Sequence, residues 1–211
     1  MKIQDLIDDG EYDLNPLYCF NIRGTNGSGK SSVIRAFMGE EYEYLTVPSI
    51  KKPAFTYVRD FNLLIIGNYL NTCGGCDNLV KAQIVQLLKI AWMTTCNILF
   101  EGVLVSDSKE PYMWLMKDLN DTLKVRNWGF VYLDTPLDTC LSRISQRNGG
   151  KEFNTLGVAA KHSNMIRYSQ WQDQFDFCKV IHTDATKTSY VVAEDIHRRI
   201  QEYKLKIGSN R

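Results

Sequence analysis

Short apolar runs alternate along the chain with stretches whose apolar residues recur every three or four positions. The runs are continuous rather than alternating, which is typical of strands that are buried on both faces of a parallel sheet. We therefore expect an α/β fold with a five-stranded parallel sheet and helices on both faces. The predicted strands are Leu17–Arg23, Leu63–Tyr69, Asn97–Val105, Gly129–Asp134 and Phe177–His182.

The stretches between these runs have the helical period. One example is the row of Val80, Ile84, Leu87 and Ala91, which places four apolar side chains on one helix face. Since ligands of such sheets bind outside the carboxyl ends of the strands, the residues after each strand are expected to share one site. The predicted helices are Ser31–Met38, Val80–Ala91, Leu137–Ile144, Val158–Asp173 and Val192–Tyr203.

Composition favours one soluble domain covering residues 1–211. The chain is 44% apolar and 23% charged, and its net charge of +1 neither favours nor excludes a nucleic-acid partner. Its first residues are acidic, unlike a secretion signal, and no apolar run approaches the roughly 20 residues of a membrane span. We expect a cytoplasmic protein without membrane contact, in which the six cysteines are reduced thiols.

The strongest motif is a phosphate-binding loop. Residues 24–31, GTNGSGKS, match the Walker A pattern G-x-x-x-x-G-K-S/T and stand between a predicted strand and a predicted helix. Glycines let successive backbone amides converge on phosphates, Lys30 adds a point charge, and the Ser31 hydroxyl is a magnesium ligand. We expect ATP and Mg²⁺ as cofactors, with the nucleotide bound by Asn26, Gly27, Ser28, Gly29, Lys30, Ser31 and Ser32.

Other strand ends indicate which kind of P-loop protein this is. The chain has no N-K-x-D segment for guanine, no D-x-x-G switch and no ABC signature, which disfavours GTPases and transporters without excluding another ATPase. Glu101 closes an apolar run, where a carboxylate can bind magnesium or orient a reactant. We expect Glu101 to act in catalysis and, with Ser31, as a metal ligand.

A helix with two arginines follows the strand that ends at Asp134. Arg143 and Arg147 are four residues apart, so they share a helix face and can neutralise phosphate charge during transfer. The following Asn-Gly-Gly can act as a hinge, so residues 143–173 are expected to form a lid and acceptor region. The alternative interpretation of the two arginines is a solvated helix face.

The segment 67–78, GNYLNTCGGCDN, follows another strand and is expected on the acceptor side. One interpretation is a glycine loop in which Tyr69, Gly74 and Gly75 bind substrate and Asp77 is the catalytic base, with Asp60 in reserve. Alternatively, Asp77 only caps the next helix. Cys73 and Cys76 also allow a redox or zinc role, although no second Cys or His pair stands at suitable spacing.

These blocks together resemble known families. Leu-Phe-Glu-Gly at 99–102 and Leu-Asp-Thr-Pro at 133–136 are similar to the magnesium-site strand and lid entry of uridine and thymidylate kinases. By that likeness the loop Thr183–Lys187 would lie against the adenine. With Cys-Gly-Gly-Cys-Asp, the chain resembles bacteriophage P-loop kinases from residue 19 to residue 148, including the 5-hydroxymethyluracil DNA kinases.

The resemblance implies an activity and a partner. The expected function is ATP-dependent transfer of a phosphate to the hydroxymethyl group of 5-hydroxymethyluracil in DNA, so the enzyme is a phosphotransferase with an alcohol acceptor. A small-molecule nucleoside or nucleotide kinase is the alternative, and a non-kinase ATPase or binding module is a third possibility. The oligomeric state does not follow from the sequence.

Overall fold

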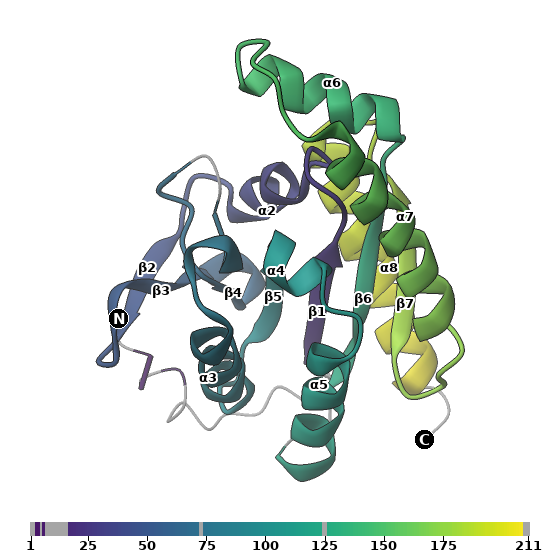
Figure 1. Cartoon of the computed structure of the whole chain (residues 1–211). Coiled ribbons are helices and arrows are strands. Elements are labelled where there is room, and N and C mark those ends of the chain that lie inside the picture. Colours follow the sequence, from purple (N-terminus) through teal and green to yellow (C-terminus); the bar gives the residue numbers. More distant parts are fainter. Residues whose placement is uncertain (1–2, 5, 7–16, 72–73, 124–125, 209–211) are drawn as a thin grey trace.

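The computed structural model of the chain describes residues 3–4, 6, 17–71, 74–123 and 126–208 (Figure 1). Its strands are β1 (Tyr18–Arg23), β2 (Glu43–Val47), β3 (Ile50–Val58), β4 (Leu63–Ile66), β5 (Asn97–Glu101), β6 (Asn127–Asp134) and β7 (Lys179–Asp184). Its α-helices are α2 (Lys30–Met38), α3 (Lys81–Trp92), α4 (Val103–Ser106), α5 (Pro111–Thr122), α6 (Leu137–Arg147), α7 (Thr155–Gln172) and α8 (Ser189–Gly208). Two 3-10 turns are η1 (Arg59–Phe61) and η2 (Cys76–Asn78).

The strands form one mixed sheet in the order β2-β3-β4-β5-β1-β6-β7. The five strands β4, β5, β1, β6 and β7 are parallel to one another. β3 pairs with β4 in antiparallel orientation, and β2 pairs with β3 in the same way. β1 lies between β5 and β6, so its carboxyl end meets the ends of both neighbours. This topology brings Gly24, Glu101 and Thr135 to one edge of the sheet.

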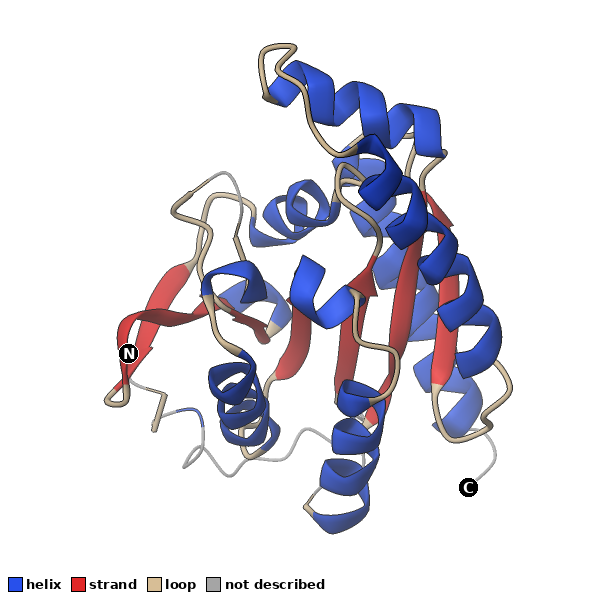
Figure 2. Cartoon of the chain, in the orientation of Figure 1, coloured by secondary structure: helices blue, strands red, loops and turns tan. Residues whose placement is uncertain are grey.

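Helices cover both faces of the sheet (Figure 2). On one face α3, α5 and α7 bury Ile84, Met113 and Met165 against the strands, and on the other face α2 and α8 bury Ile34 and Ile196. All six residues of β1 are buried, as expected for a strand with a core on each side. The sheet and its helices therefore form a rigid base for the residues at the carboxyl ends of the strands.

The predicted α/β P-loop fold is confirmed, but the predicted strand number and several boundaries are wrong. The sheet has seven strands rather than five, and it is mixed rather than parallel. The strand predicted over Leu63–Tyr69 ends at Ile66, because Gly67 adopts a φ of 95°. The strand predicted over Asn97–Val105 ends at Glu101, and the apolar residues that follow form the short helix α4.

The two unpredicted strands have a physical explanation. β3 contains Lys51, Lys52 and Pro53, and a proline with neighbouring charges argues against a strand in the interior of a sheet. β3 tolerates them because its pairing with β4 begins only at Phe55, and because Pro53 lies opposite the irregularity in β2 between Leu45 and Val47, so the proline interrupts no regular ladder. Helix α5 was not predicted, and the strand predicted over Phe177–His182 begins two residues later, at Lys179.

None of the helices within the described ranges combines the length and the hydropathy that crossing a bilayer would require.

Candidate active site at the carboxyl edge of the sheet

The phosphate-binding loop joins β1 to α2. Gly27 and Gly29 have φ values of 77° and 98°, a region that side-chain-bearing residues rarely adopt. Gly29 stands at the N-cap of α2, and no side chain caps the amides of the first helical turn. Those amides and the positive end of the helix dipole therefore point at the position where an anion would bind.

Helix α6 packs directly on this loop. A Cβ atom at Gly27 would clash with the carbonyl of Cys140, so only glycine permits this close approach. Thr135 Oγ1 donates a hydrogen bond of 2.9 Å to the Ser28 carbonyl, and it adds a second tie between the β6 end and the loop. The shape of the loop is thus determined by its own glycines and by the segment that follows β6.

Lys30 is buried beneath the loop, with 6% of its surface exposed. Its Nζ donates hydrogen bonds to the carbonyls of Gly24 (2.8 Å) and Thr25 (3.0 Å). Burial lowers the pKa of the ammonium group, while the nearby Glu101 carboxylate opposes that shift. The lysine is therefore a cation held inside the loop, where phosphate oxygens would be surrounded by amides.

Glu101 is fully buried at the end of β5. Its Oε1 accepts hydrogen bonds from Ser31 Oγ (2.9 Å) and from the Tyr69 hydroxyl (3.0 Å). Its Oε2 is buried and has no hydrogen-bond partner among the described residues. Burial raises the pKa of Glu101 to about 7, and Lys30 counteracts part of this rise. A buried carboxylate oxygen without a partner is costly, so this atom is ready for a cation or a hydroxyl group.

The loop after β4 forms a wall around Glu101. Tyr69 is 3% exposed, and a Cβ atom at Gly75 would lie 2.8 Å from the Tyr69 hydroxyl and 2.9 Å from Glu101 Oε1. Gly74 packs on the Tyr69 ring in the same way. Tyr69, Gly74 and Gly75 are all buried, and they pack against one another and Glu101. These contacts do not test the predicted substrate-binding role of the three residues, which stays a prediction.

Arg35 fixes this wall from α2, and sequence analysis had missed it. Its guanidinium group donates to the carbonyls of Tyr69 (2.9 Å) and Asn71 (2.6 Å) and lies 5.4 Å from the centre of the Tyr69 ring. Arg35 stands four residues after Ser31, which places both side chains on one face of the helix. That spacing was the only sequence signal for this contact.

Asp77 borders the same pocket but is already engaged. Its Oδ1 accepts a hydrogen bond of 2.6 Å from the backbone amide of Val103, the first residue of α4. A Cβ atom at Gly102 would lie 2.9 Å from this oxygen, which explains the glycine after Glu101. Asp77 therefore fixes the turn between β5 and α4, rather than capping a helix that begins at Asn78.

The reserve candidate Asp60 is wrong. It lies in η1, between β3 and β4, and β3 runs antiparallel to β4. The turn therefore lies at the amino end of β4, and the amide of Asn97 at the start of β5 bonds to the carbonyl of Asn62 there. Asp60 is exposed at the opposite edge of the sheet from the phosphate-binding loop.

The two arginines of α6 differ in their contacts. Arg143 Nη1 donates to the carbonyls of Gly27 and Ser28, each at 3.4 Å, and Nη2 donates to the Ala185 carbonyl at 3.1 Å. Arg147 is exposed, one turn further along, and lines the same pocket. Arg143 thus connects the phosphate-binding loop to the segment after β7, while the guanidinium group of Arg147 faces solvent.

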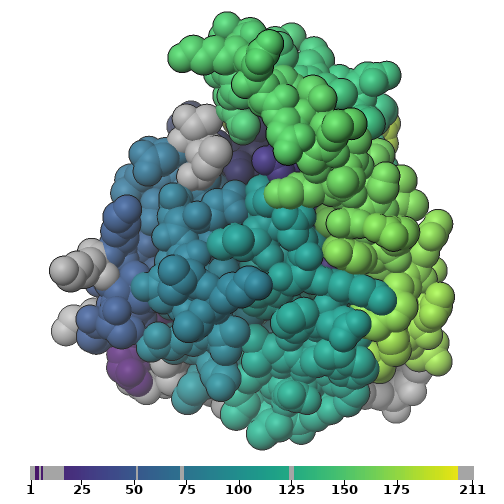
Figure 3. Space-filling view, viewed as in Figure 1, coloured from purple at the N-terminus to yellow at the C-terminus, as the bar shows by residue number. Residues whose placement is uncertain are grey.

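These residues surround one cavity of about 300 Å³. Figure 3 shows a hollow below α6, with the purple residues of the phosphate-binding loop at its floor. The structure thus brings together the residues predicted for catalysis and for metal binding, although they come from four separate segments. Its lining includes Asn26, Gly27, Gly29, Lys30, Ser31, Ser32, Asp77, Glu101, Val103, Arg143 and Arg147.

A second cavity of about 290 Å³ lies on the other side of Arg143. It is bounded by Ser32 and Val33 of α2 and by Ala185 and Lys187 of the loop after β7. The loop expected against an adenine therefore borders the phosphate-binding loop. Adenine binding by it stays a prediction.

The donor set fits magnesium better than zinc. Among the described residues no group of three or more His, Cys, Asp and Glu side chains could hold a metal ion. Mg²⁺ needs no such group, because it is usually bound by one or two protein oxygens and completes its shell with phosphates and water. The Ser31 hydroxyl beside the unpaired Glu101 Oε2 meets this requirement. Cys76 is a buried free thiol, while Cys73 lies outside the described residues.

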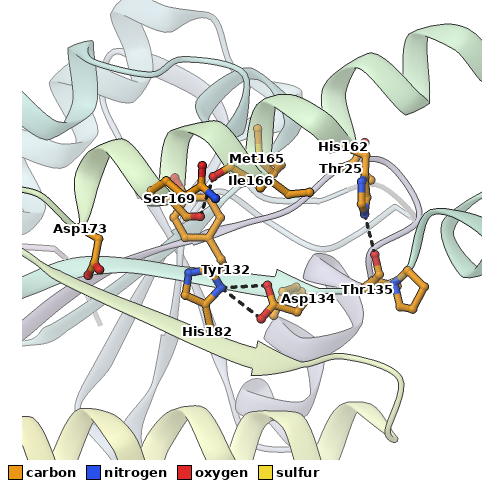
Figure 4. A pocket seen from close by; sticks show the side chains of 13 residues that line it. Thr25, Tyr132, Asp134, Thr135, His162, Met165, Ile166, Ser169, Asp173 and His182 are labelled. Atoms are coloured by element: carbon orange, nitrogen blue, oxygen red, sulfur yellow. Dashed lines mark hydrogen bonds and ion pairs between the residues drawn. The ribbon is translucent and has the colours of Figure 1, made fainter.

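A larger cavity, about 510 Å³, was not predicted from the sequence (Figure 4). It lies between α7 and the ends of β6 and β7, where His182 Nδ1 pairs with Asp134 Oδ1 at 2.9 Å. Asp134 raises the pKa of the His182 imidazole. Thr25 of the phosphate-binding loop also lines this cavity, and its hydroxyl donates to the carbonyl of Val158 in α7 (3.3 Å).

The chain was compared with known proteins. The family described as 5-hmdU DNA kinase matches residues 11–186. The 5-hmdU DNA kinase of Pseudomonas phage PaMx11 is 35% identical over 149 residues, which cover 68% of this chain and 76% of that protein. That of Pseudomonas phage M6 is 35% identical over 158 residues (70% and 81%), and 5-hmdU DNA kinase 1 of Salmonella phage ViI is 30% identical over 167 residues (77% and 73%).

A deoxyadenosine kinase from M. mycoides is similar in structure, with a TM-score of 0.46 and 17% identity over 88% of this chain and 100% of that one. Both values are too low to transfer that enzyme's substrate to this chain. The family match covers most of the chain, and it includes the phosphate-binding loop and the other residues that line the site. This chain therefore belongs to the 5-hmdU DNA kinase family.

Proposed function

We propose that this enzyme transfers the γ-phosphate of ATP to the hydroxymethyl oxygen of 5-hydroxymethyluracil in DNA. One observation carries the proposal: a protein of the 5-hmdU DNA kinase family places Lys30, Ser31, Asp77 and Glu101 around one cavity at the end of its P-loop. These are an ammonium group, a hydroxyl group and two carboxylates. Phosphoryl transfer requires such groups to hold the phosphates, the metal ion and the acceptor oxygen.

The chain supplies the phosphate site and the metal ligands. Backbone amides of residues 26–32 and the Lys30 ammonium would hold the β- and γ-phosphates. Ser31 Oγ and Glu101 Oε2 would hold Mg²⁺, which neutralises charge on the phosphate oxygens when it is bound. Arg143 already bonds to the loop, so it would fix the loop's shape, while the exposed Arg147 is free to turn toward the γ-phosphate when a lid formed by residues 143–173 closes.

The transfer moves one phosphoryl group and one proton. The acceptor oxygen forms a bond to the γ-phosphorus, the bond from that phosphorus to the β,γ-bridging oxygen breaks, and ADP leaves. The hydroxyl proton passes to a carboxylate at the rim of the cavity. Asp77 is suited to this role because its Oδ1 is fixed by the Val103 amide, which leaves Oδ2 to meet the acceptor.

We expect Asp77→Asn to lower kcat by about 10²-fold, because an amide cannot accept the proton. The asparagine oxygen can still accept the hydrogen bond from Val103, so the turn should survive. The measurement is steady-state phosphorylation of an oligonucleotide that contains hydroxymethyluracil. A kcat near that of the wild type would reduce Asp77 to a structural cap, whereas a loss confined to KM would assign it to substrate binding alone.

We expect Tyr69→Phe to lower activity and Mg²⁺ affinity by roughly tenfold, as losses of contacts to metal ligands commonly do. The change removes the hydroxyl that orients Glu101 Oε1 and leaves the buried ring in place. The concentration of Mg²⁺ for half-maximal ATP binding, measured by titration calorimetry, is a readout independent of turnover. Tyr18→Phe, at the amino end of β1, is the matched control for a buried tyrosine, and an equal effect of both variants would contradict the assigned role.

The acceptor is tested by label transfer. The protein is incubated with ATP labelled at the γ-phosphate, Mg²⁺ and one of three acceptors: duplex DNA with hydroxymethyluracil, the same DNA with thymine, or the free nucleoside. The proposal predicts label in the first acceptor alone. Label only in the nucleoside would make the protein a small-molecule kinase, and ATP hydrolysis that no acceptor stimulates would make it an ATPase.

A further inference from the structure

This inference rests on the function proposed above. If the acceptor is a base in duplex DNA, its hydroxyl group must be able to reach the transferred phosphate. The reacting oxygen must come within roughly 3.5 Å of the γ-phosphorus, at the floor of a recessed cavity of about 300 Å³. A hydroxymethyl group extends only one carbon and one oxygen beyond the pyrimidine ring. A base that stays stacked in the duplex therefore keeps its hydroxyl group too far from the floor. Enzymes that act on bases solve this problem by turning the base out of the stack.

One apolar side chain close in sequence to a contact with the phosphate-binding loop is unusually exposed. Leu156 is 82% exposed, more than any other large apolar side chain in the part of the chain that the structure describes. It belongs to the first turn of α7, which begins after the N-cap residue Asn154. The carbonyl of Val158, two residues further along α7, accepts a hydrogen bond from the Thr25 hydroxyl group. The start of α7 therefore lies beside the phosphate-binding loop.

The opposite rim also exposes apolar groups. Leu104 is 40% exposed on α4, next to Val103, which lines the phosphate cavity. Leu70 is 62% exposed in the loop after β4, next to the buried Tyr69. Single exposed leucines are common on protein surfaces, so exposure by itself decides nothing. Here Leu104 is on a helix that borders the cavity, and Leu156 is in a helical turn that contacts the phosphate-binding loop.

The charge around Leu156 suits a nucleic acid. Residues 137–172, from α6 to the end of α7, hold five cations against two anions, Asp138 and Glu152. Arg147 and Lys151 are exposed on the α6 side of the turn that leads to Leu156. Phosphates attract such cations, and proteins that unstack DNA commonly insert an apolar side chain beside them. The whole chain has a net charge of +1, so this segment is more positive than the average of the chain.

We propose that Leu156 is a wedge: it enters the base stack at the place that the extruded hydroxymethyluracil leaves, while the exposed Lys151 contacts a flanking phosphate. The wedge lowers the cost of holding the base outside the duplex. It is a specificity determinant for double-stranded acceptors and takes no part in the transfer of the phosphate.

The test compares two acceptors and two variants. Leu156→Ser should lower the ratio of kcat/KM for the duplex to kcat/KM for the single strand by about tenfold, because only the duplex requires unstacking. Ile166→Ser is the matched control, since Ile166 is half exposed on the same helix, about 15 Å further along. That variant should leave the ratio within twofold of the wild type, about the error of such kinetic comparisons.

A mismatch opposite the hydroxymethyluracil weakens the stack, so the deficit of Leu156→Ser should shrink on that duplex. An unchanged ratio for Leu156→Ser, an equal loss on both acceptors, or the same change in Ile166→Ser would each overturn the wedge. A wild-type protein that phosphorylates neither form of DNA would instead refute the proposed function. Thermal unfolding identifies a misfolded variant, and Leu156→Asn then replaces Leu156→Ser in the same comparison.

Discussion

Lys30→Ala is expected to lower kcat/KM for phosphoryl transfer by roughly 10³-fold, the scale on which single cations contribute to such reactions. The side chain is buried beneath the loop, and its ammonium group lies within hydrogen-bond distance of two loop carbonyls. An alanine leaves no cation at this position. The backbone amides of the loop are then the loop's only groups that stabilise the negative charge of the phosphates. The measurement is steady-state transfer from ATP to DNA that contains hydroxymethyluracil.

The matched control for this loss is Lys89→Ala. Lys89 is an exposed cation in the last turn of α3, away from the phosphate cavity, and its loss should leave kcat/KM within twofold of the wild type. Lys30→Arg keeps the charge but not the compact ammonium group, and it should recover little activity in so confined a site. Near-normal transfer by Lys30→Ala would mean that the triphosphate binds elsewhere.

Glu101→Gln is expected to lower kcat by about 10²-fold or more, because an amide is a much weaker ligand for Mg²⁺ than a carboxylate. The glutamine oxygen can still accept the Ser31 and Tyr69 hydrogen bonds, so the wall around this position should persist. Binding of ATP in the presence and absence of Mg²⁺, measured by calorimetry, separates metal binding from nucleotide binding. Equal Mg²⁺ dependence in the variant and the wild type would contradict the role.

Stability provides an independent check on Glu101 in metal-free protein. Its pKa is raised from 4.5 to about 7 in the folded protein, so the folded state binds more protons than the unfolded state between these values. The free energy of unfolding of the wild type should therefore fall as pH rises from 4.5 to 7. Glu101→Gln lacks this titration, so its stability relative to the wild type should increase over the same window. A variant that unfolds more readily at pH 8 with EDTA present would indicate a structural need for the carboxylate.

The sequence predicted the parts of the site that are local. Residues 24–31 carry the whole Walker A pattern, and their glycines dictate a turn between β1 and α2 without help from distant residues. Glu101 was predicted as a site residue for a similarly local reason, because a carboxylate at the end of an apolar run requires a cation or a hydrogen-bond donor as its partner. Parallel strands then bring their carboxyl ends together, which is why four separated segments could be assigned to one edge of the sheet.

Long-range contacts could not be predicted in this way. The contact between Tyr69 and Glu101 spans 32 positions of sequence, and no periodicity reports which side chain meets which across two strand ends. Gly74 and Gly75 were predicted to bind substrate, but no periodicity indicates that Tyr69 and Glu101 lie against them. The strands were predicted too long at Gly67 and Gly102 because apolar residues continue past the turn, and apolarity alone does not distinguish a strand from a short buried helix.

The position of the transferred phosphate tests the central claim most directly. DNA that contains hydroxymethyluracil is treated with the enzyme and Mg-ATP, digested to nucleoside 5′-monophosphates without phosphatase, and analysed by mass spectrometry with fragmentation. The account predicts a nucleotide with a second phosphate that remains with the base fragment, on the hydroxymethyl oxygen, and predicts its absence with Lys30→Ala. A second phosphate that stays with the sugar fragment, or that appears equally in thymine-containing DNA, would contradict it.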